Sequence, residues 1–170
     1  MHPNTPSPDQ AAAINTIKDG SSRYSLLTAA PGSGKSFVIR AAYQMGVPLI
    51  PSSTTGVSAV NMGIGARTIN AVLGYFDSDD MRRKHDEGKI YNHLKDISGR
   101  TLVIDEASML SATQLQIIML NNERLWQSTG QGVNILLVGD YGQLPPVKEA
   151  PSFESPLWKY IHTIRLTNIH

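Results

Sequence analysis

A lysine and a serine follow a glycine-rich turn early in the chain, in an order that suits phosphate binding. The run from Ala29 to Ser36 reads Ala-Ala-Pro-Gly-Ser-Gly-Lys-Ser, and it departs from the usual phosphate-loop pattern only in having Ala29 where glycine is expected. Glycines let successive backbone N–H groups point toward a phosphate. Lys35 is then predicted to reach the β- and γ-phosphates, and the Ser36 hydroxyl to bind Mg²⁺. The predicted phosphate-binding residues are Ala30, Pro31, Gly32, Ser33, Gly34, Lys35 and Ser36.

Two adjacent carboxylates follow an apolar run in the second half of the chain. Residues 101–104 read Thr-Leu-Val-Ile and have the character of a buried strand, and Asp105 and Glu106 come directly after it. In open α/β sheets, ligands bind at the carboxyl ends of the strands. Asp105 is therefore predicted to hold Mg²⁺ opposite Ser36, and Glu106 to orient and deprotonate an attacking water.

A third polar loop follows the apolar run 133–138. It carries Gln143 ahead of Pro145 and Pro146, which cannot continue a central strand or a helix. Gln143 is predicted to reach the same edge of the sheet and to hydrogen-bond a γ-phosphate. The alternative interpretation is a turn that the two prolines merely brace.

The elements that must position these side chains alternate between strand and helix. Residues 24–28, 47–51, 101–104, 133–138 and 162–167 are predicted strands, and helices are predicted from Ser36 and over 111–127. A further helix begins at Ser7, which can cap it, with Pro8 in the first position, and ends before Gly20. This alternation indicates an α/β fold with a parallel sheet.

Some polar residues allow two interpretations. Gln10 is either an ordinary helix residue or a reader of adenine, because its amide can both donate and accept a hydrogen bond. The hydroxyl-rich turns at 52–56 and 63–68 either hold phosphate groups or simply cap surface helices. Residues 75–99 are polar and of mixed charge, so the segment is either a solvated face or, through the basic run 82–85, a contact for a polyanion.

Composition excludes several classes of protein. The 170 residues contain no cysteine, which excludes disulfides, zinc-thiolate sites and thiol catalysis. Fifteen Lys and Arg against fourteen Asp and Glu give no overall basic charge, so any nucleic-acid contact must be local. No apolar run has the length of a membrane span or a signal core, and we expect an intracellular protein with no membrane partner.

The motifs recur together in one known order. The chain resembles the first RecA-like motor domain of superfamily 1B DNA helicases of the RecD/Pif type, over nearly everything from residue 10 to residue 167. The segments that carry this resemblance are Gln10, Ala29–Ser36, Thr54–Gly56 with Ala59, Thr68–Asn70 with Leu73 and Gly74, Asp105–Met109, and Gly139–Asp140 with Gln143–Val147.

The resemblance implies a RecA-like P-loop NTPase fold, a mostly parallel central sheet with helices on both faces, over residues 7–170 after a flexible lead-in at 1–6. It implies ATP and Mg²⁺ as cofactors, Gln10 as an adenine contact, and a Gln143 that links the γ-phosphate to DNA contacts. Thr55, Gly56 and Thr68 would lie along single-stranded DNA, and Asn70, which stands where the family usually has His, would be a fourth nucleic-acid residue. The 75–99 segment sits where the family places a small strand-separating element, and movement would run 5′ to 3′.

In this family ATP binds between two RecA-like domains, and residues 166–170 resemble the run that leads to the second one. We therefore expect that domain to be absent here and to be supplied by the parent protein or another protomer, with the arginines that accelerate hydrolysis. The chain alone is expected to turn over slowly and not to unwind DNA. The alternatives are a nucleotide-gated module that binds single-stranded DNA or protein without useful turnover, a P-loop phosphotransferase, and a Rossmann-like domain with an empty site.

Overall fold

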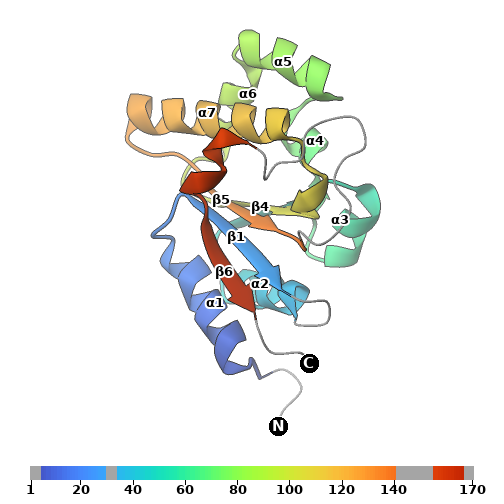
Figure 1. Cartoon of the computed structure of the whole chain (residues 1–170), viewed down its shortest axis with the longest axis vertical. Helices are drawn as coiled ribbons and strands as arrows, with labels where there is room; N and C mark the ends of the chain where they lie inside the picture. Colours follow the sequence, from blue (N-terminus) through green and yellow to red (C-terminus); the bar gives the residue numbers. More distant parts are fainter. Residues whose placement is uncertain (1–4, 30–33, 141–154, 167–170) are drawn as a thin grey trace.

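A six-stranded sheet runs through the centre of the computed structural model, which describes residues 5–29, 34–140 and 155–166 (Figure 1). The strands lie side by side in the order β3-β2-β4-β5-β1-β6, and every pairing is parallel. All carboxyl ends therefore lie at one edge of the sheet. The strands are β1 (Tyr24–Ala29), β2 (Leu49–Ser53), β3 (Arg67–Thr68), β4 (Thr101–Asp105), β5 (Asn134–Val138) and β6 (His162–Leu166).

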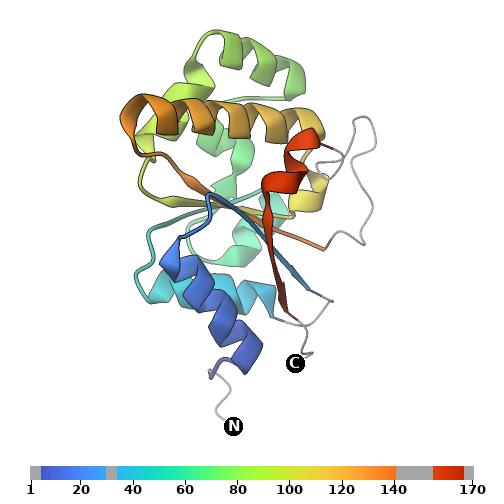
Figure 2. The same ribbon diagram turned by 60° about the vertical axis from the view of Figure 1, so that its left-hand side comes forward.

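Helices cover both faces of this sheet (Figures 1 and 2). One face carries α1 (Pro8–Asp19), α2 (Lys35–Gln44) and α3 (Gly56–Met62). The other face carries α4 (Ile69–Leu73), α5 (Ser78–Asp86), α6 (Lys89–Asp96) and α7 (Ala112–Thr129), with the short 3₁₀ helices η1 (Ala107–Met109) and η3 (Pro156–Tyr160). The predicted α/β architecture, with a parallel sheet and helices on both faces, is confirmed.

The central strands β1, β4 and β5 read as largely apolar runs because both of their sides are buried. Along β4, Leu102 and Ile104 pack in the core cluster beneath α7, whereas Val103 between them packs in the cluster beneath α1 and α2. In β1, Leu26 and Leu27 divide between the two clusters in the same way. Side chains alternate across a strand, so a sheet covered on both faces requires apolar residues at every position.

The predicted start of the first helix is confirmed. Ser7 is the N-cap of α1 and accepts a hydrogen bond from the Gln10 backbone N–H, while the Gln10 side chain accepts one from the Ser7 N–H. Pro8 stands in the first turn, and Gly20 ends the helix in the left-handed conformation. Such reciprocal capping satisfies N–H groups that the helix cannot pair internally.

The polar stretch 75–99 is more deeply integrated than its composition suggests. It forms α5 and α6, which pack on each other and on α7. Met81, Ile90 and Leu94 lie fully buried in the same core cluster as the sheet, while most of the charged residues of these helices are exposed. The segment is therefore part of the domain core as well as a solvated face.

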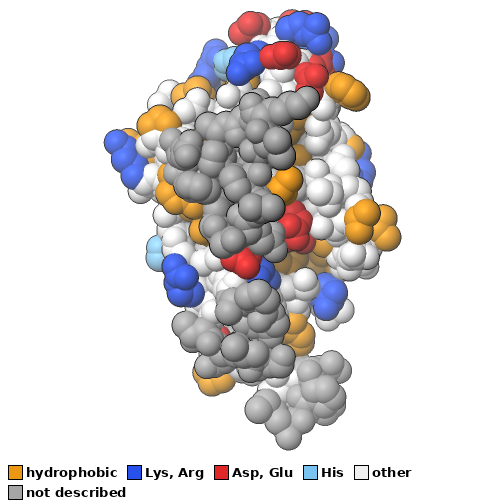
Figure 3. Space-filling model, turned by 45° about the vertical axis from the view of Figure 1, so that its right-hand side comes forward, with side chains coloured by type: hydrophobic (Ala, Val, Ile, Leu, Met, Phe, Trp, Pro, Cys, Tyr) orange, Lys and Arg blue, Asp and Glu red, His pale blue; other side chains and the backbone are white. Residues whose placement is uncertain are grey.

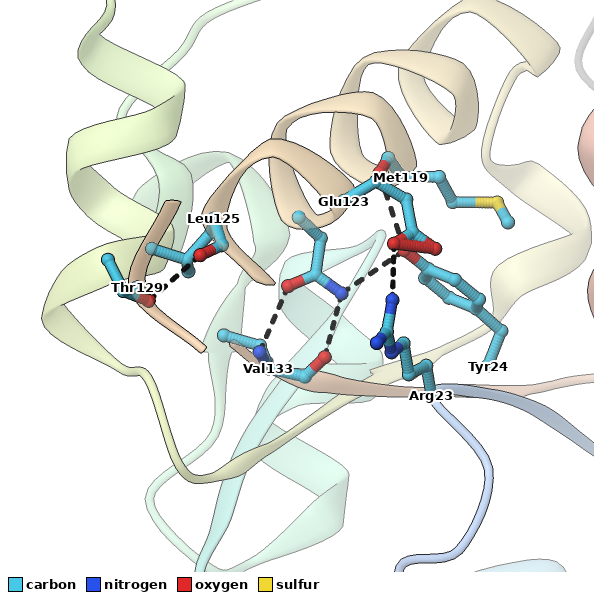
Figure 4. Close-up of polar contacts among 8 residues, drawn as sticks. Arg23, Tyr24, Met119, Glu123, Leu125, Thr129 and Val133 are labelled. Carbon is cyan, nitrogen blue, oxygen red and sulfur yellow. Dashed lines mark hydrogen bonds and ion pairs between the residues drawn. The ribbon is translucent and has the colours of Figure 1, made fainter. Parts of the chain in front are cut away.

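Buried polar groups join α7 to the amino-terminal ends of β1 and β5, at the edge opposite the predicted site. Asn122 is fully buried; its side chain bonds the Val133 N–H and C=O and donates to the Tyr24 hydroxyl. The Tyr24 hydroxyl in turn donates to the Met119 carbonyl (Figure 4). Burial is the main cause that raises the pKa of Tyr24 to about 12.

Among the described helices, none is long and apolar enough to cross a membrane.

Candidate active site

The end of the phosphate-loop pattern meets the start of α2 at the carboxyl edge of the sheet. Gly34 is the N-cap of α2 with φ of 88°, a left-handed conformation that favours glycine, and Lys35 and Ser36 form the first turn. Ser36 is exposed and Lys35 is half-buried. The predicted residues Ala30, Pro31, Gly32 and Ser33, and likewise Gln143, lie outside the described residues.

The hydroxyl of α2 and the first carboxylate of the Asp-Glu pair come together as predicted. Ser36 and Asp105 line the same small pocket, together with Ile39, Arg40 and Val138. Asp105 ends β4 and accepts a hydrogen bond from the Glu106 N–H at 2.9 Å. A hydroxyl and a carboxylate oxygen are the hard ligands that Mg²⁺ prefers, and this ion usually takes few protein ligands beside water and phosphate.

The donor set fits Mg²⁺ better than it fits a metal held by the protein alone. Among residues 5–29, 34–140 and 155–166, no group of three or more His, Asp or Glu side chains could hold a metal ion. Burial raises the pKa of Asp105, and the hydrogen bond from the Glu106 N–H and the Lys35 ammonium offset this effect only in part. A cation beside Asp105 would stabilise its charged form.

Glu106 occupies an electrostatic setting suited to a base. Burial is the first cause that raises its pKa, and the negative charges of Asp105 and Asp140 add to the effect, while Lys35 opposes it. A carboxylate with a raised pKa accepts a proton more readily at neutral pH. Lys35, Asp105 and Glu106 are thus close enough to influence one another, as the sequence predicted.

The backbone of Glu106 is held in an unfavourable conformation. Its φ of 52° and ψ of 42° lie in the left-handed region, and among the described residues no other non-glycine residue has a positive φ. The Thr54 hydroxyl donates to the Glu106 carbonyl at 2.9 Å. The Thr54 N–H and the Ser53 hydroxyl both donate to the Asp105 carbonyl, at 3.1 and 3.3 Å. The segment after β2 therefore fixes the Asp-Glu turn.

Gln10 is an ordinary helix residue in one respect, because it caps α1, and it also lies at the predicted phosphate site. Its side chain closes the capping box of α1, and the same side chain lies against Gly34, where an added methyl group would collide with the Gln10 amide nitrogen. Gln10 is buried. The structure thus brings Gln10, from a separate helix, beside the glycine that ends the described part of the phosphate-loop pattern, and its contact with adenine stays a prediction.

The four predicted nucleic-acid residues lie beside this site, in two neighbouring turns. Thr55 caps α3 by accepting from the Ser58 N–H, Gly56 begins that helix on an open surface, and Thr68 caps α4 by accepting from the Ala71 N–H. Asn70 donates to the Phe76 carbonyl at 2.9 Å. The capping interpretation is confirmed for both threonines, and their hydroxyl hydrogens can still donate to a ligand.

Sheet register places these residues close to the carboxylates. Ser53 of β2 stands opposite Thr68 of β3 on one side and opposite Asp105 of β4 on the other. Neighbouring strands lie roughly 4.8 Å apart, so Thr68 and Asp105 are about 10 Å apart across the sheet.

Sequence reasoning gave no site role to Thr54, Arg40 or Asp140, although Thr54 and Asp140 stand in segments that carry the family resemblance. Arg40 could have been found by helical spacing, because it follows Ser36 by one turn and so shares its face. Asp140 directly follows Gly139 at the carboxyl end of β5, so the strand-end rule points to it as well. The role of Thr54 depends on a contact across 52 positions of sequence, which no local pattern indicates.

Comparison with known proteins gives matches over almost the whole chain. A family model described as "AAA domain" matches residues 5–170. The chain is 32% identical over 153 residues to the ATP-dependent DNA helicase Pif1 of Bdellovibrio bacteriovorus, covering 83% of this chain and 33% of that protein. It is 30% identical over 172 residues to the ATP-dependent RecD2 DNA helicase of Deinococcus radiodurans, covering 96% of this chain and 21% of that protein.

The fold also matches a solved structure, which confirms the RecA-like prediction. The crystal structure of the Pif1 helicase from Candida albicans superposes with a TM-score of 0.76 at 24% identity, over 98% of this chain and 40% of that one. The chain spans a third or less of the length of the two relatives described above.

Proposed function

The chain belongs to the AAA domain family, and from this premise we propose that it is the ATP-binding and ATP-hydrolysing motor domain of a DNA helicase of the RecD/Pif type. The observation that carries the proposal is the meeting of Ser36 and Asp105 in one pocket, with Lys35 beside Asp105 and Glu106. Relatives that match most of the chain are ATP-dependent DNA helicases.

Each residue of the site has a distinct part in the proposed reaction. Lys35 binds the β- and γ-phosphates, together with residues 30–34 and Gln143. Ser36 and Asp105 hold Mg²⁺, which neutralises phosphate charge when bound. Glu106 orients the attacking water and takes its proton, which its raised pKa supports. Gln10, lying against Gly34, contacts the adenine base.

Single-stranded DNA is the proposed polymer, held by Thr55, Gly56, Thr68 and Asn70. Support comes from the exposure of Thr55 and Gly56 and from the hydrogen bonds that join the preceding residue, Thr54, to the Asp-Glu turn. A movement of the Asp-Glu turn during hydrolysis would therefore be transmitted through these hydrogen bonds to the segment that contacts DNA. This connection favours a motor over a phosphotransferase, whose acceptor site needs no such link.

The proposed partner is a second RecA-like domain, in the same protein or in another protomer. An arginine from that partner would stabilise charge on the transferring phosphoryl group, which can raise the rate by about a thousandfold or more. Translocation also requires two DNA contacts that move relative to each other. The 170-residue chain alone is therefore expected to hydrolyse ATP slowly and not to separate strands. The 5′ to 3′ direction follows from the family resemblance.

The experiment that tests this function is ATP turnover by the purified chain, with and without single-stranded DNA, for the wild type and Glu106→Gln. Loss of a general base lowers rates by roughly 10²- to 10⁴-fold, so the variant should fall to background while nucleotide affinity is retained. Glu87→Gln, which changes an exposed carboxylate on another surface, is the matched control. Turnover of Glu106→Gln equal to wild type would favour the binding module without useful turnover.

A further inference from the structure

One large apolar side chain stands out in the loop between α4 and α5. Phe76 is 83% exposed, the highest value among the large hydrophobic residues that the structure describes, whereas Tyr75 beside it is 5% exposed and packs in the core. The backbone thus anchors the loop through one aromatic ring and directs the next one into solvent.

The loop holds Phe76 by both of its backbone polar groups. The Phe76 carbonyl accepts from the Asn70 side chain at 2.9 Å, and the Phe76 N–H donates to an Asp80 carboxylate oxygen at 2.8 Å. The other Asp80 oxygen accepts from Arg83 at 3.0 Å. The ring is therefore presented from a fixed backbone, which lowers the entropy lost when a ligand packs on it.

The charges around Phe76 nearly cancel, so the loop presents an aromatic ring without a strong net charge. Asp77 at the N-cap of α5 and Asp79, Asp80 and Asp86 within it are nearly balanced by Arg82, Arg83 and Lys84, and two ion pairs join Arg82 to Asp79 and Arg83 to Asp80. Figure 3 shows acidic and basic side chains mixed at the end of the molecule formed by α5. Attraction of a phosphate chain to this surface should accordingly be weak.

The neighbours of Phe76 indicate which ligand the ring meets. Asn70, which bonds its carbonyl, follows Thr68 in the turn that we place along single-stranded DNA. A base that is unpaired exposes an aromatic face, and proteins bind such bases by stacking them on aromatic side chains without reading the sequence. A neutral surface with one exposed ring suits the base rather than the phosphate.

We propose that Phe76 is a stacking platform for an unpaired nucleobase, at the end of the strand path that passes Thr68 and Asn70. This inference rests on the proposed function, because it takes single-stranded nucleic acid as the ligand. It adds a contact outside the motifs on which the family resemblance depends. Asn70 acts here through the backbone of Phe76, as a positioning residue.

The test measures binding of fluorescently labelled oligodeoxythymidine to the full chain. Phe76→Ala should weaken binding by roughly 5- to 100-fold, the range that one base–aromatic stack supports. Phe76→Leu should lose most of this affinity as well, because it keeps an apolar side chain but removes the ring. The salt dependence of binding should stay unchanged in both variants, since no phosphate contact is removed. Tyr160→Ala, which removes an exposed ring on η3, is the matched control and should bind as wild type.

A fluorescent ring gives a second and direct readout. Phe76→Trp should bind as well as wild type, and its added emission should be quenched by the oligonucleotide, after subtraction of the signal from the two native tryptophans. Nucleotide affinity should be equal in every Phe76 variant and in wild type, which also reports that the variants are folded.

The outcomes separate this inference from the function on which it rests. If wild type binds the oligonucleotide and Phe76→Ala binds equally well, the stacking platform is refuted and the proposed function stands. If wild type does not bind single-stranded DNA in any nucleotide state, both fail. Equal losses of affinity in Phe76→Ala and Tyr160→Ala would mean that exposed rings bind the oligonucleotide through general apolar adhesion, which would overturn the proposal. Self-association of wild type that Phe76→Ala abolishes would assign the ring to a protein interface and would overturn it as well.

Discussion

Replacing Glu106 by glycine should make the domain more stable than replacing it by alanine, the reverse of the usual order. Glu106 has φ of 52°, a conformation that costs a residue with a side chain about 1–2 kcal/mol. Glycine does not have this cost, but its freer unfolded chain offsets about 0.4–1 kcal/mol of the gain. Glu106→Gly should therefore exceed Glu106→Ala in free energy of unfolding by roughly 0.5–1 kcal/mol.

Comparing the two variants isolates the backbone effect. Both lack the carboxylate, so both lose the repulsion from Asp105 and Asp140, and both keep the carbonyl that accepts from Thr54. The matched pair is Glu87→Gly and Glu87→Ala, at an exposed glutamate with φ of −82°. At that position, glycine should be the less stable variant.

Urea unfolding followed by circular dichroism, at one pH and salt concentration, gives all four free energies. In thermal unfolding the difference at position 106 corresponds to about 1–4 °C for a domain of this size. A Glu106→Gly variant that is less stable than Glu106→Ala, by the margin found at position 87, would refute the claim that the predicted base is held in a strained conformation.

Three further predictions concern other parts of the molecule. Thr54→Val should lower ATP turnover about tenfold at unchanged nucleotide affinity, because the Glu106 carbonyl loses the hydroxyl that donates to it at 2.9 Å. Thr54→Ser keeps a hydroxyl and should restore the rate. Equal rates in all three proteins would contradict this. Wild type should lose on the order of 2 kcal/mol of stability as pH rises from about 10 to about 12, because burial raises the pKa of Tyr24 to about 12 and the unfolded chain releases that proton first. Urea titrations at pH about 10 and about 12 should show a smaller loss for Tyr24→Phe, and equal losses would contradict this. Leu94→Ala should lower the free energy of unfolding in urea by about 2–5 kcal/mol, because it leaves a cavity between α6 and the core. Leu120→Ala, at a half-exposed position of α7, should lower it much less. Small and similar losses in both variants would mean that the 75–99 segment is not part of the core.

Local signals were sufficient for much of the fold. Ser7, Pro8 and Gly20 gave the ends of α1, because capping and left-handed glycine depend on a few adjacent residues. The apolar run before Asp105 gave β4 and placed the carboxylate at the edge of the sheet. The meeting of Ser36 with Asp105 then followed from the rule that parallel strands end at a common edge.

What the sequence could not predict depends on contacts between distant segments. The Thr54 hydroxyl reaches Glu106 only because β2 lies beside β4, and that strand order is not readable from spacing. The left-handed conformation of Glu106 has no signal in its residue type, since glutamate is uncommon there. The adjacent aromatics Tyr75 and Phe76 also look alike in sequence, and only packing decides which one is buried.

The measurement that tests the central claim most directly is calorimetric binding of a non-hydrolysable ATP analogue, with and without Mg²⁺, to wild type and Lys35→Ala. In the proposed site Lys35 contacts the phosphates, and Ser36 and Asp105, which line one pocket, hold the ion. Wild type should bind the analogue in a Mg²⁺-dependent way, and Lys35→Ala should weaken this binding at least tenfold, the effect of about 1.4 kcal/mol lost from a charged contact. Binding that is unchanged in Lys35→Ala, or indifferent to Mg²⁺, would contradict the assignment of this edge of the sheet as a nucleotide site.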